Sequence, residues 1–207
     1  MLALMRLSPV IPVLTVAGAE DGLAQARALV AGGLPIIEVT LRTAGALAAI
    51  SAIRQALPQA TVGAGTIVEP EQMAPSVAAG AAFLVSPGTT PRLADAAAQA
   101  PVPFMPGAAT ASEAMALRER GFRGLKFFPA EASGGVSCLA ALAAPLADLC
   151  FCPTGGIDAQ KAVRYLALKN VLCVGGSWMV PATTVQSGDY ASIQELARSA
   201  AAALRAV

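Results

Sequence analysis

The chain has 207 residues, of which 56% are hydrophobic and 13% charged, and its formal net charge is +1. This length fits one α/β domain, and a charged fraction well below the ~25% of ordinary soluble domains indicates that much of its surface meets protein, as at a subunit interface. The near-neutral balance, with basic residues scattered along the chain, excludes an electrostatic surface for nucleic acid or anionic lipid.

Short apolar segments alternate with alanine-rich helical segments along the chain. Eight strands are predicted, at residues 9–14, 35–41, 61–65, 82–86, 102–105, 124–128, 149–152 and 171–174. Helices are predicted at residues 23–31, 44–56, 70–79, 92–100, 111–120, 136–147, 159–168 and 191–206. A helix after each strand, with strands recurring every roughly 20 to 25 residues, predicts an α/β fold of the (β/α)8 TIM-barrel type, in one domain spanning residues 1–207.

A doubly wound open sheet is the alternative arrangement of the same elements. Gly, Pro and polar residues gather after nearly every predicted strand. An open sheet concentrates such residues at one switch point, whereas a barrel uses the ends of all its strands. The barrel is therefore the preferred prediction.

Two further features bear on where the protein works. The uncharged segments 74–91 and 171–188 are interrupted by Gly, Pro and Ser, and the first residues lack the order of a secretory signal. The four cysteines, Cys138, Cys150, Cys152 and Cys173, form no CxxC pair, which indicates reduced core residues. We therefore expect a cytoplasmic protein outside the membrane, whose partners are small molecules and copies of itself.

The sixth predicted strand carries one lysine, Lys126, among apolar neighbours. Burial disfavours the charged form of an amine, so a lysine in this setting can act as a nucleophile near neutral pH. The alternative is that Lys126 runs its stem along apolar surface or pairs with a carboxylate. Because the chain has no histidine, zinc sites with His ligands and Ser-His triads are excluded, and proton transfer falls to carboxylate, lysine, tyrosine, substrate phosphate or water.

Glu38, Thr40 and Arg42 occupy alternate positions at the end of the second predicted strand, so their side chains are predicted to face one side. Charges that point into a barrel indicate a site. The alternative is an internal Glu38–Arg42 ion pair. Thr66 ends the next strand and would lie at the same mouth, although threonine after glycine is also ordinary turn chemistry.

Glycine pairs follow the last two predicted strands, at Gly155–Gly156 and Gly175–Gly176. Backbone N–H groups in such turns can approach an anion, and barrels commonly bind phosphate at this place. The alternative is that these are only tight turns. A rigid turn at Pro87 ends an earlier strand and is expected to shape a pocket.

Seven motifs occur in order over nearly the whole chain: 38-EVTLRT-43, 63-GAGT-66, 86-SPG-88, 107-GAAT-110, 126-KFFPAE-131, 153-PTGGI-157 and 175-GGSW-178. Together they resemble the bacterial 2-keto-3-deoxy-6-phosphogluconate (KDPG) aldolases of the Entner–Doudoroff pathway. The resemblance implies a class I, Schiff-base lyase that forms a homotrimer of barrels and needs no metal or organic cofactor. It also implies the reaction, the reversible cleavage of 2-dehydro-3-deoxy-6-phosphogluconate to pyruvate and D-glyceraldehyde 3-phosphate, with 4-hydroxy-2-oxoglutarate as a further candidate substrate.

The same resemblance assigns roles to individual residues. It implies that Lys126 forms the Schiff base and that Glu38 is the general acid/base. It implies that Arg42 and Thr66 hold the pyruvate carboxylate, while Pro87 and Phe128 line the pocket. Thr154 is implied to contact the substrate, and Gly155, Gly156 and Ser177 to receive the phosphate. The chain starts only a few residues before its first strand. A shortened version of the helix that closes the barrel bottom in relatives is therefore expected.

Two other functions fit parts of this pattern. A phosphosugar isomerase or epimerase would use the same glycine turns, but it needs no nucleophilic lysine in an apolar strand. A non-catalytic binding or scaffold barrel would leave Glu38, Arg42 and Lys126 as unexplained inward charges, and fold alone does not decide between these functions.

Overall fold

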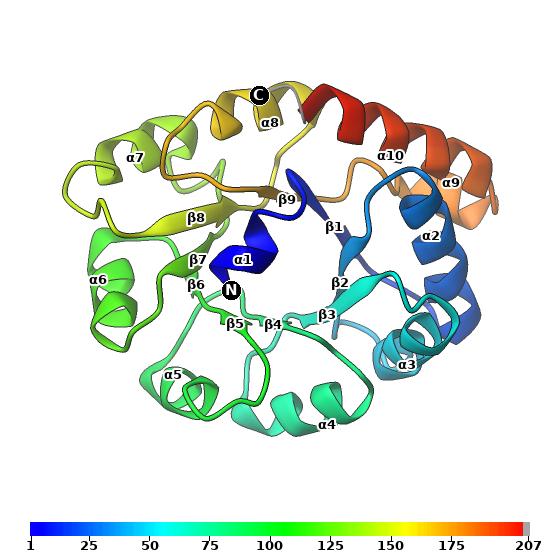
Figure 1. The fold of residues 1–207 in the computed structure, drawn as a ribbon, viewed down its shortest axis with the longest axis horizontal. Helices are drawn as coiled ribbons and strands as arrows, with labels where there is room; N and C mark the ends of the chain where they lie inside the picture. Colours follow the sequence, from blue (N-terminus) through cyan, green and yellow to red (C-terminus); the bar gives the residue numbers. More distant parts are fainter. Residues whose placement is uncertain (205–207) are drawn as a thin grey trace.

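A computed structural model describes residues 1–204, and its strands form curled parallel sheets with the long helices outside them (Figure 1). The strands are β1 (Val10–Leu14), β2 (Ile36–Thr40), β3 (Thr61–Gly65), β4 (Leu84–Val85), β5 (Phe104–Met105), β6 (Gly107–Ala108), β7 (Gly124–Phe127), β8 (Cys150–Pro153) and β9 (Val174–Gly176). Six of them form a parallel sheet in the order β5-β4-β3-β2-β1-β9, and a second parallel sheet has the order β6-β7-β8. An α/β fold with parallel strands is confirmed.

The helices form a layer around the strands (Figure 1). They are α1 (Leu2–Met5), α2 (Ala19–Ala31), α3 (Ala46–Ala56), the 3-10 turn η1 (Pro70–Gln72), α4 (Met73–Ala78), α5 (Pro91–Ala97), α6 (Ala111–Glu119), α7 (Gly135–Leu142), α8 (Ala159–Leu166), α9 (Ala182–Gln186) and α10 (Tyr190–Leu204). Within residues 1–204, none of these helices has the length and apolar character needed to cross a membrane.

Several predicted bounds are wrong, and proline explains two of the differences. The predicted strand 102–105 begins only at Phe104, and β6 follows Pro106, because proline has no N–H to give to a ladder. The predicted helix 136–147 ends at Leu142, ahead of Pro145. The last predicted strand, 171–174, lies later, as β9. Helix α9 was not predicted, whereas α1, with 4 residues, agrees with the expected short N-terminal helix. The end of the predicted helix 191–206 lies outside the described residues.

Side-chain caps determine where two of the helices after the strands begin. The Thr110 hydroxyl accepts a hydrogen bond from the N–H of Glu113, whose carboxylate accepts one from the N–H of Thr110, which forms a capping box at α6. At α8 the Asp158 carboxylate accepts from the N–H of Lys161 at 2.9 Å. Helix α8 therefore begins directly after the Gly155–Gly156 turn.

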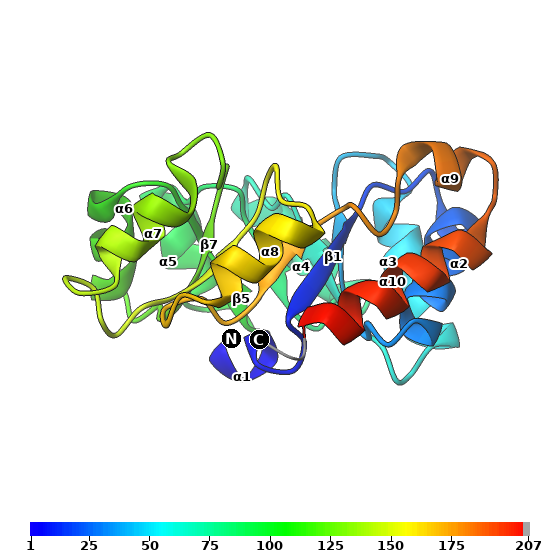
Figure 2. The same cartoon turned by 90° about the horizontal axis from the view of Figure 1, so that it is seen from above.

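The N-terminal helix α1 lies across one end of the curled sheet (Figure 2). Met5 is completely buried in an apolar cluster with Ile11, Phe83 and Cys173, among others. A Cβ on Gly124, the first residue of β7, would lie 2.7 Å from the Met5 sulfur, so α1 packs on the beginnings of the strands. The opposite end, where the strands terminate, is left for a site.

The cysteines are all free thiols in this structure. Cys152 and Cys173 are buried, as predicted, whereas Cys138 and Cys150 are only partly buried. The expected core position is therefore confirmed for two of the four.

Candidate active site

Lys126 and Glu38 form a buried ion pair inside the curled sheet. Lys126 lies on β7 and Glu38 on β2, 88 residues apart, and the Lys126 Nζ donates to Glu38 Oε1 at 3.0 Å. Only 5% of Lys126 and 2% of Glu38 are exposed to solvent. Their strands belong to different sheets on opposite sides of the ring of strands (Figure 1), so the two side chains meet in its interior.

Neighbouring residues explain how the Lys126–Glu38 pair is accommodated inside the curled sheet. A Cβ on Gly65 would lie 2.1 Å from Glu38 Oε1, so a glycine in β3 provides the space for the carboxylate. The Lys126 Nζ lies 5.5 Å from the centroid of the Phe128 ring, within cation–π range. Leu125 and Phe127 point to the other face of β7 and lie in the main apolar core.

The ion pair bears on two alternatives from the sequence: that Lys126 pairs with a carboxylate, and that Glu38 pairs with Arg42. Lys126 does pair with a carboxylate, and no ion pair joins Glu38 to Arg42 within residues 1–204. Burying two charges costs desolvation energy that offsets most of their attraction, so a buried ion pair is weak evidence for a role in stability. Its position, among the residues predicted to form a site, favours a role in chemistry.

A cavity of about 240 Å³ brings six of the predicted site residues together. These are Arg42, Phe128, Thr154, Gly155, Gly156 and Ser177, and the remaining lining comes from Val13, Thr15, Ile157 and Gly176. Lys126 and Glu38 are not among the lining residues, but Lys126 contacts the cavity wall through Phe128. Thr15 was missed by sequence reasoning, although it follows β1 in the way that the other site residues follow their strands.

Thr66 and Pro87 follow the neighbouring strands β3 and β4, at the same end of the sheet, but neither lines this cavity. The backbone of Thr66 has φ +62, which is an uncommon and strained conformation for a β-branched residue. Such strain clusters at functional sites. The conformation of Thr66 is thus a sign of function that residue type alone does not reveal.

Arg42 carries the free positive charge at the cavity. It lies just beyond the end of β2, is exposed, and forms no ion pair within residues 1–204. Its guanidinium is available to a carboxylate or phosphate. In the same part of the chain, no group of three or more Cys, Asp and Glu side chains could hold a metal ion.

Thr154 lies at the end of β8 with its hydroxyl facing β9. A Cβ on Gly175 would lie 2.2 Å from Thr154 Oγ1, so this glycine makes room for the hydroxyl. The hydroxyl has a long hydrogen bond, of 3.4 Å, to the carbonyl of Cys152. A ligand with a better-placed acceptor or donor would compete with this bond.

The turn after β8 has the geometry of an anion site. Gly155 has φ +105 and Gly156 has φ +74, conformations that favour glycine. Within residues 1–204 the backbone N–H groups of Gly156, Ile157 and Ser177 donate to no protein acceptor. All three residues line the small cavity, and backbone N–H groups without a protein acceptor are suited to holding an anion.

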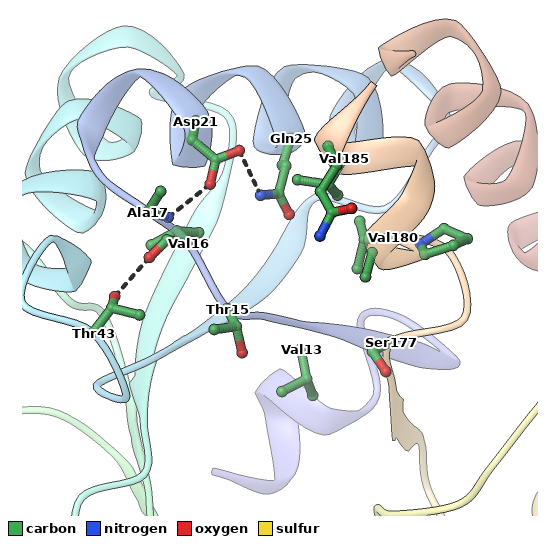
Figure 3. Close-up of a pocket in the computed structure, with 13 residues that line it drawn as sticks. Val13, Thr15, Val16, Ala17, Asp21, Gln25, Thr43, Ser177, Val180 and Val185 are labelled. Carbon is green, nitrogen blue, oxygen red and sulfur yellow. Dashed lines mark hydrogen bonds between the residues drawn. The ribbon is translucent and has the colours of Figure 1, made fainter. Parts of the chain in front are cut away.

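A second cavity, of about 550 Å³, adjoins the first and shares Val13, Thr15 and Ser177 with it. Figure 3 shows hydrogen bonds among its lining residues: Asp21 accepts from the N–H of Ala17 at 2.8 Å and from the amide of Gln25 at 2.9 Å, and the Thr43 hydroxyl donates to the Val16 carbonyl. Most of the other lining is apolar. This cavity widens the mouth of the site, and of the predicted residues only Ser177 borders it.

A buried lysine beside a carboxylate, with a free guanidinium and a glycine turn nearby, is a combination of groups that Schiff-base chemistry on an anionic carbonyl compound uses. The family model "Aldolase: KDPG and KHG aldolase" matches residues 1–196. The chain is 50% identical to 2-dehydro-3-deoxy-phosphogluconate aldolase of Dickeya dadantii and 49% identical to KHG/KDPG aldolase of Escherichia coli, each over 96% of this chain and 93% of the relative.

Solved structures agree with the sequence comparison. The chain superposes with a TM-score of 0.94 and 42% identity on KDPG aldolase of Legionella pneumophila, which was crystallised with pyruvate captured at low pH as a covalent carbinolamine intermediate. The superposition covers 97% of both chains. The chain belongs to the KDPG and KHG aldolase family.

Proposed function

We propose that this protein is a class I aldolase that reversibly cleaves 2-dehydro-3-deoxy-6-phosphogluconate to pyruvate and D-glyceraldehyde 3-phosphate. The observation that carries the proposal is the buried Lys126–Glu38 pair, with 3.0 Å between Nζ and Oε1. Breaking a carbon–carbon bond next to a hydroxyl leaves a carbanion, and a lysine iminium accepts its electrons. The shared name KHG/KDPG of one relative supports a second activity, cleavage of 4-hydroxy-2-oxoglutarate to pyruvate and glyoxylate.

The reaction begins when the Lys126 amine attacks the C2 ketone of the substrate. Glu38 moves protons, through water, while the resulting carbinolamine loses water to form the iminium. Glu38 then takes the proton of the C4 hydroxyl as the C3–C4 bond breaks and its electron pair enters the iminium. The aldehyde leaves, the enamine is protonated at C3, and hydrolysis frees pyruvate and Lys126. The carbinolamine captured in the Legionella relative supports the first step.

Other residues orient the substrate around Lys126. Arg42, with Thr66, binds the carboxylate next to the reacting ketone, and a bidentate contact would also fix the direction of C2. Phe128 and Pro87 form the wall around the pyruvyl group. The phosphate is bound by the turn at Gly155 and Gly156 and by Ser177, which is supported by their common cavity and by the unpaired N–H groups there.

Pyruvate release in a coupled assay tests the reaction, with the phosphogluconate and phosphogalactonate substrates compared side by side. Borohydride added with pyruvate is expected to inactivate the enzyme and to leave a stable adduct on Lys126. Peptide mapping locates the adduct. An adduct on Lys161 or Lys169 would contradict the assignment, and an isomerase or a binding protein would form none.

Arg42→Ala is expected to raise the KM for the phosphorylated substrate by about 10- to 100-fold, since the carboxylate loses a charged, hydrogen-bonded partner. Steady-state kinetics measure this change. Arg27→Ala is the matched control, because Arg27 is an exposed arginine on α2, away from the cavity residues. An unchanged KM in Arg42→Ala would show that Arg42 does not bind substrate.

Thr154→Val is expected to lower kcat/KM for the phosphogluconate substrate selectively, so that the preference over its C4 epimer narrows or reverses. Leaving the substrate hydroxyl without its hydrogen-bond partner is expected to reduce the stabilisation of the transition state by about 1 to 3 kcal/mol. This corresponds to a decrease in kcat/KM of roughly 5- to 150-fold. Valine keeps nearly the same volume in this buried position. Equal losses on both epimers would place the discriminating contact elsewhere.

We also infer that the two sheets form one closed (β/α)8 barrel in a single domain over residues 1–207, of which 205–207 lie outside the described part. Only Pro106 separates β5 from β6, so one continuous segment joins the sheets at that side. At the other side, parallel bridges between Phe151 and Val171 and between Thr154 and Gly175 connect β8 with β9 and the segment before it.

A homotrimer in the cytoplasm remains part of the proposal. The low charged fraction of the chain, 13%, supports a buried interface between subunits. Sedimentation equilibrium of the purified protein would test the trimer directly, and a monomer would remove this part of the proposal.

A further inference from the structure

A cluster of three side chains behind the Gly155–Gly156 turn has no part in the steps above. We name Glu131, Lys161 and Tyr165 the Glu131 cluster. The Lys161 Nζ donates to Glu131 Oε2 at 3.1 Å and to the Gly156 carbonyl at 2.7 Å, and the Tyr165 hydroxyl donates to Glu131 Oε1. The cluster thus bonds helix α8 both to the segment after β7 and to the turn.

Backbone hydrogen bonds also join the segment after β7 to the turn after β8. The N–H of Ala130 donates to the Thr154 carbonyl at 2.8 Å, and the N–H of Glu131 donates to the Gly155 carbonyl at 3.2 Å. A Cβ on Gly156 would lie 3.0 Å from Glu131 Cγ, so the Glu131 side chain lies directly against the turn. The Glu131 carboxylate is therefore fixed relative to the turn as well as to α8.

The bond from Lys161 determines how one peptide group of the turn is oriented. In a trans peptide the carbonyl and the following N–H point in opposite directions. Because the Gly156 carbonyl points to Lys161, the N–H of Ile157 points away from Lys161. Ile157 lines the small cavity with Gly155 and Gly156, and its N–H has no acceptor within residues 1–204. A rotation of this peptide group would withdraw a donor from the anion site.

Tyr165 anchors the cluster on the side of α8. Tyr165 is completely buried, and Lys161 and Tyr165 stand one helical turn apart on that helix. The hydrogen bond from Tyr165, with a further contribution from Lys161, lowers the pKa of the Glu131 carboxyl, which therefore stays ionised at neutral pH. Both carboxylate oxygens are held, so Lys161 has a fixed anchor beside the turn.

We propose that Glu131, Lys161 and Tyr165 are positioning residues that orient the Gly156–Ile157 peptide so that its N–H binds the phosphate of the substrate. This inference rests on the proposed aldolase function and adds a determinant of specificity for phosphorylated substrates. A competing explanation is that Lys161 simply attracts the phosphate by its charge. The two explanations predict opposite signs for the removal of the negative charge of Glu131.

The experiment compares Lys161→Met, Glu131→Gln and Tyr165→Phe with the wild type. Each is expected to raise the KM for the phosphorylated substrate, about tenfold for Lys161→Met and Glu131→Gln and less for Tyr165→Phe, with kcat within about twofold. Inhibition by inorganic phosphate should weaken in parallel. Exchange of the pyruvate methyl protons with deuterium, which needs the Schiff base but no phosphate, should be unchanged. Lys169→Met is the matched control, since Lys169 is exposed beyond the end of α8.

Three results would overturn the proposal. A lower KM in Glu131→Gln would show that charge attraction, not positioning, is at work. If KM and phosphate inhibition are both unchanged in Lys161→Met and Glu131→Gln, the cluster does not act on the turn. If methyl exchange is slowed in these variants, the cluster has a general structural role. If the wild type itself neither releases pyruvate nor exchanges methyl protons, the proposed function fails, whereas an active wild type with unaffected variants removes only this inference.

Discussion

Replacing Lys126 with methionine is expected to lower kcat by roughly 10⁵-fold or more, because a methionine side chain cannot form the iminium that accepts the electrons of the breaking bond. The variant also leaves the Glu38 carboxylate buried without a cationic partner, which is expected to cost about 3 to 5 kcal/mol of folding free energy. Single-turnover kinetics measure the first effect, and chemical denaturation measures the second.

Lys126→Arg separates these two effects. Arginine keeps a positive charge beside Glu38, so this variant should be more stable than Lys126→Met, but a guanidinium does not form the iminium. We expect both variants to be inactive and unable to form the borohydride adduct. Residual turnover above about one hundredth of the wild-type rate in Lys126→Arg would mean that the nucleophile is another group.

Glu38→Gln is expected to lower kcat by roughly 10² to 10⁴, the range for loss of a general acid/base, while much of the affinity for pyruvate is retained. Glutamine keeps the size of the side chain in the space left by Gly65, and its amide oxygen can still accept from Lys126. The measurement is kcat alongside the inhibition constant for pyruvate. Glu20→Gln, at an exposed position in the first turn of α2, is the matched control.

Near-normal turnover in Glu38→Gln would exclude Glu38 as the proton carrier. Another carboxylate, a lysine, a tyrosine, the substrate phosphate or water would then have to move the protons, since the chain has no histidine.

How far the site could be predicted is clearest from Glu38 and Lys126. Each residue could be placed on its strand because a charged residue within an apolar run occupies a position whose side chain faces the interior, and this is a local pattern. Their 3.0 Å contact does not follow from any local pattern, because it depends on how strands 88 residues apart are placed across the interior. The sequence therefore indicated both residues, but it left open whether Glu38 would pair with Arg42 and did not identify a carboxylate partner for Lys126.

The parts that could not be predicted share a physical cause. Thr66 has a positive φ that surrounding structure imposes, and residue type alone does not encode it. Lys161 and Tyr165 lie on α8, where a lysine and a tyrosine one turn apart look like an ordinary partly buried helix face. Their contact with Glu131 forms only when α8 packs beside the segment after β7. Tertiary packing, rather than local preference, creates these features.

The position of α1 restricts the routes by which small molecules reach Lys126. Met5 and the buried side chains around it, such as Phe83 and Cys173, fill that end of the interior, so reactants enter and products depart through the opposite mouth. In the proposed reaction the pyruvyl group on Lys126 lies deeper than the aldehyde, whose phosphate is held on the rim. The aldehyde leaves before pyruvate because the three-carbon fragment stays attached to Lys126 as an enamine until it is protonated and hydrolysed, and in the reverse direction pyruvate must react with Lys126 first. Helix α1 thus closes one end of the interior to small molecules, while the covalent bond to Lys126 determines the order in which the two products leave.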